Sequence, residues 1–76
     1  MSGLFAAGAA LRVAVAGGGV VTGVVERVEE VRPMGGLPGM VRRLTVRLPD
    51  GARTEAIVTG ERPPAFADPR YVHVPG

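Results

Sequence analysis

Few side chains in this sequence have the chemistry of an enzyme active site. The 76-residue chain contains one serine, Ser2, one histidine, His73, and neither cysteine nor lysine. An activated nucleophile needs a base within hydrogen-bonding reach and a third group that orients the base, and these residues cannot supply that set. His73 could act alone beside Tyr71 or Asp68, but an outward-facing position on a C-terminal strand is the simpler interpretation. We therefore predict that the protein is not an enzyme.

Metal and cofactor sites are equally hard to assemble from these residues. A metal would need His73 together with carboxylates such as Asp68 and Glu61, and one histidine without cysteine is a weak signal. Glu29 and Glu30 are neighbours on an expected strand, so their side chains point to opposite faces and do not form an acid–base pair. The glycines within 17–23 lack the spacing of a dinucleotide-binding loop. We predict no cofactor, no metal and no small-molecule substrate.

Arginines on a predicted hairpin are better candidates for a binding role. All nine basic residues are arginine, although the net charge is only +2. Arg43 and Arg47 project from one face, and Arg53 could join them across the turn, so three guanidinium groups could contact phosphates. This face lacks the aromatic residues on which single-stranded bases stack, and Glu55 is expected opposite, so an arginine–glutamate ladder is at least as good an interpretation. Nucleic-acid binding is our alternative hypothesis.

The elements that would position these residues are β-strands. Valine dominates the apolar residues, only three residues are aromatic, and 12 glycines and 7 prolines interrupt the helical period over most of the chain. The clearest element is a hairpin over 40–60, in which Leu44, Val46 and Leu48 alternate with polar residues up to a Pro-Asp-Gly turn. A return strand follows this turn.

About five strands are expected in one small domain. They cover residues 11–16, 20–32, 40–48, 52–60 and 71–75. The second strand changes phase once, and a β-bulge near Glu29 and Glu30 would restore its inward alternation. The expected core is apolar throughout and consists of Leu11, Val13, Val15, Val24, Val28, Leu44, Val46, Leu48, Val58, Val72 and Val74. We predict an all-β fold, a small antiparallel β-barrel in the SH3-like style, because a closed barrel leaves no exposed strand edge.

Residues 1–10 are expected to form an apolar N-terminal arm that precedes the barrel of residues 11–76. The segment is uncharged, and Leu4 and Phe5 are its natural anchors. It is about half as long as a membrane-spanning helix and has no basic residues ahead of it, so we predict neither a transmembrane segment nor a signal peptide. Two alternatives remain open for the arm, which either folds back onto its own barrel or reaches another subunit.

Protein–protein contact is the function that the sequence favours. Apolar residues outside the expected core lie in the arm (Leu4 and Phe5), in a glycine- and proline-rich loop (Met34 and Leu37) and in a proline-rich loop (Phe66). A chain of this size buries only about 60% of the surface that its unfolded form exposes, so it has difficulty hiding these groups. We expect a soluble structural or adaptor protein in a homomeric or larger assembly, cytoplasmic or particle-associated. A capsid-decorating or connector protein of a virion would be one example.

Overall fold

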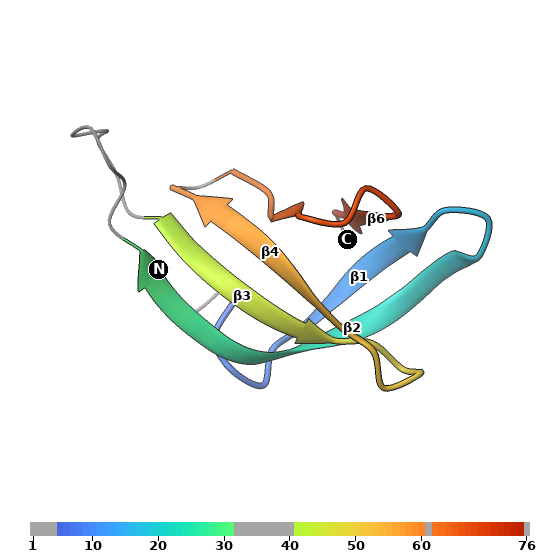
Figure 1. Ribbon diagram of the computed structural model, residues 1–76, viewed down its shortest axis with the longest axis horizontal. Coiled ribbons are helices and arrows are strands. Elements are labelled where there is room, and N and C mark those ends of the chain that lie inside the picture. Colours follow the sequence, from blue (N-terminus) through green and yellow to red (C-terminus); the bar gives the residue numbers. More distant parts are fainter. Residues whose placement is uncertain (1–4, 32–40, 61, 76) are drawn as a thin grey trace.

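The computed structural model describes residues 5–31, 41–60 and 62–75, which form one antiparallel sheet nearly closed into a barrel (Figure 1). The six strands are β1 (Ala10–Val15), β2 (Gly19–Val31), β3 (Val41–Arg47), β4 (Arg53–Thr59), β5 (Ala65–Phe66) and β6 (Tyr71–Val74). The predicted small all-β barrel is confirmed, and the strand beyond the expected five is the two-residue β5. None of the described residues belongs to a helix long and apolar enough to cross a membrane.

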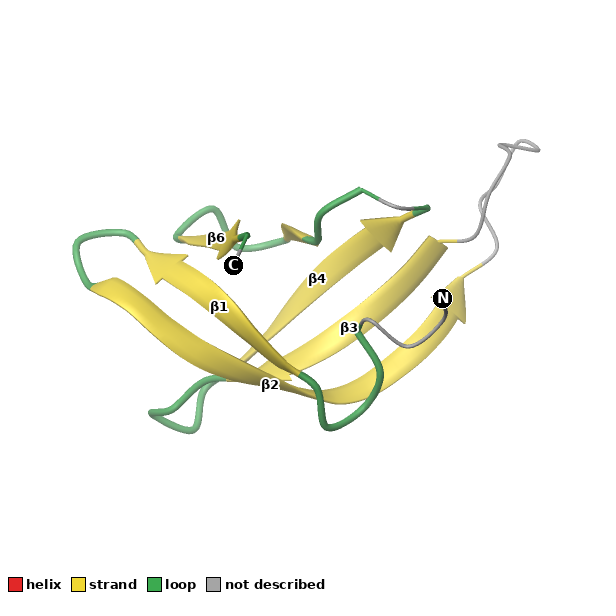
Figure 2. Ribbon diagram, turned by 180° about the vertical axis from the view of Figure 1, so that it is seen from behind, coloured by secondary structure: helices red, strands yellow, loops and turns green. Residues whose placement is uncertain are grey.

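The strand order is β5-β4-β3-β2-β1-β6, so the last strand returns to pair with the first (Figure 2). β2 serves two neighbours, because its residues 19–24 pair with β1 and its residues 24–31 pair with β3. At the seam between β5 and β6 the rings of Phe66 and Tyr71 meet edge to face, with centroids 6.1 Å apart. No backbone ladder crosses this seam within the described ranges, so side-chain packing closes the barrel there.

A β-bulge in β2 allows one strand to curve from one neighbour to the other. Val25 lies opposite Val46 of β3, whereas the next residue of β3 lies opposite Arg27. Glu26 is therefore the extra residue, and the inserted residue bends the strand and increases its twist. The long curve of β2 is visible along the lower edge of the barrel in Figure 1.

The bulge corrects two predictions about the second strand. It lies at Glu26 and not near Glu29 and Glu30, and the residue that enters the core ahead of it is Val25, with Val24 only partly buried. The sequence alone could not determine which residues of β2 point inward. β2 carries a pair of valines on each side of its glycine, so either choice of alternation places a valine in the core.

Among the described residues, eight apolar side chains form the core of the barrel. They are Leu11, Val13, Val25, Leu44, Val46, Leu48, Ala56 and Val58. The hairpin prediction is confirmed in detail, since β3 and β4 both turn the expected residues inward. The prediction for the C-terminal strand is wrong in phase: Val72 is 61% exposed, while Tyr71 packs against the core. The Tyr71 ring, which is larger than a valine side chain, packs beside Phe66 at the seam.

The described part of the N-terminal segment, residues 5–10, lies against its own chain. The Gly8 N–H donates to the Val25 carbonyl at 2.7 Å, and the Val25 N–H donates to the Ala9 carbonyl at 2.9 Å. Phe5 is partly buried against the core and meets the His73 ring edge to face at 5.9 Å. Of the two alternatives for the predicted arm, residues 5–10 therefore take the fold-back onto their own barrel.

Gly23 provides a test of how tightly the bent β2 packs on β3. A Cβ atom there would lie 2.7 Å from Cγ1 of the fully buried Val46 and 3.5 Å from the Arg47 carbonyl, so Gly23→Ala forces a core side chain to move. We expect a loss of about 1–3 kcal/mol in the free energy of unfolding, measured with urea. Gly18→Ala is the matched control, because its Cβ would make only ordinary contact with Val15 at 3.5 Å. Equal stability of the two variants would contradict this packing.

Candidate interaction surfaces

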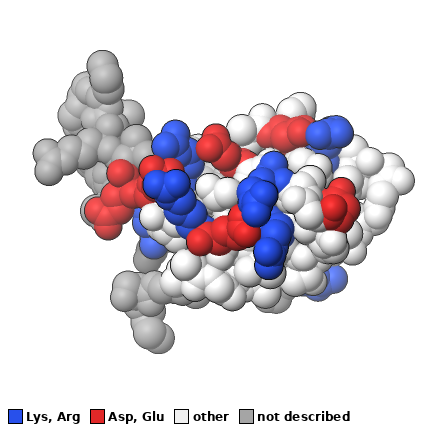
Figure 3. Space-filling model, turned by 60° about the horizontal axis from the view of Figure 1, so that its bottom comes forward, with Lys and Arg blue, Asp and Glu red and all other residues white. Residues whose placement is uncertain are grey.

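The outer side chains of β2, β3 and β4 form a charged face in which arginine and glutamate alternate (Figure 3). Glu26, the bulge residue, is central to it. Its carboxylate accepts a hydrogen bond from Arg53 Nε at 2.6 Å and lies 3.5 Å from Arg47 Nη1. One glutamate of β2 therefore contacts β3, its paired neighbour, and also β4, which lies one strand further across the sheet.

A second glutamate of β2, Glu29, lies three residues further along the strand and also contacts two arginines. Glu29 Oε1 accepts a hydrogen bond from Arg43 Nη2 at 3.2 Å, and Arg27 of the same strand lies 3.8 Å away. The three arginines predicted to bind phosphates, Arg43, Arg47 and Arg53, thus each face a carboxylate. The ladder alternative is the arrangement that the structure shows, but its acidic partners come from β2 and not from Glu55.

The ion pairs on the charged face alter the titration of Glu26. The hydrogen bond from Arg53 holds the pKa of the Glu26 carboxyl below its usual value, and the charges of Arg53 and Arg47 lower it further, while partial burial opposes them. The same hydrogen bond raises the pKa of Arg53. Both groups therefore stay ionised at neutral pH, and the glutamate compensates the arginines that would otherwise be available to phosphates.

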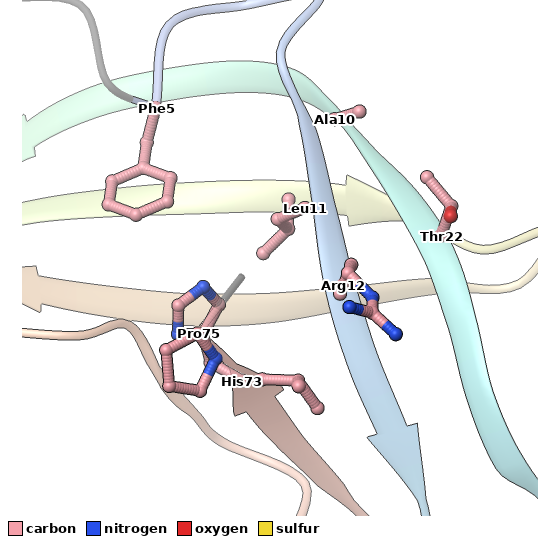
Figure 4. Close-up of a pocket in the computed structure, with 8 residues that line it drawn as sticks. Phe5, Ala10, Leu11, Arg12, Thr22, His73 and Pro75 are labelled. Carbon is pink, nitrogen blue, oxygen red and sulfur yellow. The ribbon is translucent and has the colours of Figure 1, made fainter.

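An open groove of about 610 Å³ lies where β6 ends beside the N-terminal segment (Figure 4). Its lining is mostly apolar and comprises Phe5, Ala10, Leu11, Arg12, Thr22, His73, Val74 and Pro75. His73 Nδ1 is buried and has no hydrogen-bond partner among the described residues. Figure 4 shows Phe5 beside the imidazole, while Arg12 and Thr22 lie farther from it along β1 and β2.

Among the described residues, the structure places no carboxylate in an ion pair or hydrogen bond with His73. The described ranges contain no group of three His, Cys, Asp or Glu side chains that could hold a metal ion. Asp68, the carboxylate considered beside it, instead pairs with Arg70 at 2.7 Å. The groove therefore offers an imidazole in apolar surroundings, and the predictions of no metal and no enzymatic activity stay predictions.

A third surface, the apolar face, lies on the outer side of β6, β1 and β2. Ala14 is directly opposite both Val72 and Val20, so these three side chains form a row across three strands. Val72 is 61% exposed and Val20 is 49% exposed. In the next row Arg12 lies between Thr22 and Val74. The sequence analysis did not predict this face, because it assigned Val72 to the core. The signal that could have indicated it is the alternation in the first strand, which turns Arg12 and Ala14 outward.

The residues predicted to form a protein interface have mixed positions. Phe5 and Phe66 are both partly buried and pack against the core of their own barrel. Leu4, Met34 and Leu37 lie outside the described residues. The interface prediction for all five stays untested, but the apolar groups that the described chain exposes most are the valines of the apolar face.

No protein-family model, no curated protein and no solved structure matches this chain. Function must therefore be inferred from the surfaces themselves.

The pKa of Glu26 predicts how the charged face responds to acid. Because the folded-state pKa is lower than the unfolded one, ionised Glu26 stabilises the fold above the unfolded pKa, and this contribution is lost as the pH falls through the folded-state pKa. We expect Glu26→Gln to lower the thermal midpoint at neutral pH and to match the wild type in acid below that lower pKa. Glu30→Gln, on the same strand, is the control. A difference that persists unchanged in acid would contradict this account.

The ion pairs also predict weak binding of nucleic acid. Since Arg43 and Arg47 are already paired with glutamates, we expect no gel shift with single- or double-stranded DNA or RNA even at low salt. The informative variant is Glu26→Gln, which frees Arg47 and Arg53 and should give weak, salt-sensitive binding if phosphates can approach this face. A wild-type shift that disappears in Arg43→Glu/Arg47→Glu would favour the nucleic-acid hypothesis instead.

Proposed function

We propose that this chain is a non-enzymatic structural or adaptor protein that acts through protein–protein contacts in a homomeric or larger assembly. The apolar face of β6, β1 and β2 is the surface that we assign to this contact. The observation that supports it best is the row formed by Val72, Ala14 and Val20, in which two of the three side chains are about half exposed or more.

The apolar face departs from the usual pattern of a sheet that meets water. Antiparallel strands with one buried face normally alternate apolar residues inward and polar residues outward. β3 follows this rule, and β4 follows it except at Ile57, with Arg43, Arg47, Arg53 and Glu55 outward. The row of Val72, Ala14 and Val20 breaks it on three adjacent strands at once. Single exposed valines are ordinary on a protein surface, whereas a contiguous row indicates a surface that another molecule covers.

The charged face gives nucleic-acid binding, our alternative hypothesis, less support than the apolar face gives protein–protein contact. Nucleic-acid binding needs arginines whose charge is available to phosphates, and those of the predicted stripe are paired with Glu26 and Glu29. Within the proposed class, a capsid-decorating or connector component of a particle is the most specific role that we put forward. Its support is a small, nearly closed β-barrel that carries an outward apolar row.

Val72 is the residue with which to test this proposal. We expect wild-type protein to show a mass that rises with concentration in light scattering or sedimentation, and Val72→Arg to weaken this association at least about tenfold, because the variant places a charge within the apolar row. Val72→Thr keeps the shape and the strand preference and serves as the matched control. A wild type that stays monomeric and captures no protein, or a Val72→Arg variant that associates as the wild type does, would contradict the assignment.

A further inference from the structure

Arg12 is an uncompensated charge in the middle of the apolar face. Five arginines of the described chain take part in ion pairs, namely Arg27, Arg43, Arg47, Arg53 and Arg70. Arg12 has no ion-pair partner among the described residues, and its cross-strand neighbours Thr22 and Val74 are uncharged. Its side chain is exposed, with the row of Val72, Ala14 and Val20 beside it. A molecule that covers this face must therefore supply an anion for Arg12.

Glu55 is the corresponding uncompensated anion on β4. It points outward opposite the uncharged Thr45 and has no ion-pair partner among the residues that the structure describes. Beside it on the same face are Ile57 and, on the adjoining strand, Ala65. We call Glu55, Ile57 and Ala65 the β4–β5 face. This surface borders the charged face, because Ile57 lies opposite Arg43 and Arg53 precedes Glu55 on the outer side of β4. Like the apolar face, it carries a charge without an ion-pair partner beside apolar side chains, but the sign is opposite.

These two faces cannot meet within one molecule. In the strand order β5-β4-β3-β2-β1-β6, β1 and β4 are separated by two intervening strands on one side and by the seam on the other. In a nearly closed barrel of six strands this separation places their outer surfaces on opposite sides (Figure 1). Arg12 of one copy can therefore reach Glu55 only on a different copy.

We infer that the molecule covering the apolar face is a second copy of this chain, and that Arg12 of one copy pairs with Glu55 of the next. This inference rests on the proposed role in protein contacts and names the partner at the same surface. The row of Val72, Ala14 and Val20 packs against Ile57 and Ala65 of the neighbouring copy. Water is excluded around the pair of charges, so their attraction is stronger than that of an exposed surface pair and fixes the register of the contact.

The geometry also sets the kind of assembly. The contact joins two different faces, so it is heterologous, and an open series of copies always ends in one free apolar face and one free β4–β5 face. Such contacts produce rings when the rotation between copies closes and open filaments when it does not. A two-fold symmetric dimer through this contact is excluded, because both faces of one copy would have to contact the same neighbour, and the two faces lie on opposite sides of the barrel.

Charge reversal tests the pairing directly. We expect Arg12→Glu and Glu55→Arg each to weaken self-association about tenfold or more in sedimentation, because each places two like charges at the contact. The double variant should associate as the wild type does, because each of its contacts joins opposite charges. An equimolar mixture of the two single variants should also regain association, because each contact between unlike copies joins opposite charges. Arg62→Glu makes the same change of charge at an exposed position on neither face and should leave association unchanged. Circular dichroism of each variant verifies that the barrel is folded.

Each outcome supports or overturns a defined statement. If both single variants are impaired and the mixture is restored, the pairing of Arg12 with Glu55 is established. If Val72→Arg prevents association but the charge reversals do not, or if the mixture is not restored, this inference is wrong while the proposed function stands. A wild type that is monomeric at every concentration overturns this inference, and the proposed function then depends on capture of a different protein.

Discussion

The bulge at Glu26 is the constraint on which both the barrel and its surface chemistry depend. By adding one residue to β2, it lets a single strand pair with β1 over its first half and with β3 over its second. The same insertion aims the Glu26 carboxylate at Arg47 and Arg53. The same inserted residue therefore bends β2 and places a carboxylate beside two arginines. As a result, the arginines of the charged face, which the sequence suggests could bind phosphates, are largely neutralised by glutamates.

The local parts of this fold could be predicted from the sequence. The hairpin of β3 and β4 follows from strict alternation around a Pro-Asp-Gly turn, and Gly51 adopts the positive φ that such a turn requires. The Asp50 carboxylate accepts a hydrogen bond from the Ala52 N–H at 3.0 Å, as an Asx turn should. These features succeed because neighbouring residues determine them.

The features that failed depend on residues far apart in the chain. β2 offers valines in both phases, so the location of its bulge is decided by β3 and by the N-terminal segment that bonds to Val25. β6 turns Tyr71 inward because Phe66 lies across the seam, which alternation within four residues cannot reveal. Because Tyr71 and not Val72 packs against the core, Val72 is left on the outer side of β6, where it forms part of the apolar face. A prediction that placed Val72 inward could therefore not reveal the surface that we assign to function.

The seam between β5 and β6 is the line along which we expect the barrel to open locally. β5 is only two residues long, and within the described chain it meets β6 through the rings of Phe66 and Tyr71 without a shared ladder. Opening at that line breaks one aromatic contact and leaves the long pairings of β2 with β3 and of β3 with β4 in place. Within the described chain, we therefore expect the stretch from β5 to β6 to open at a lower cost in free energy than the central hairpin.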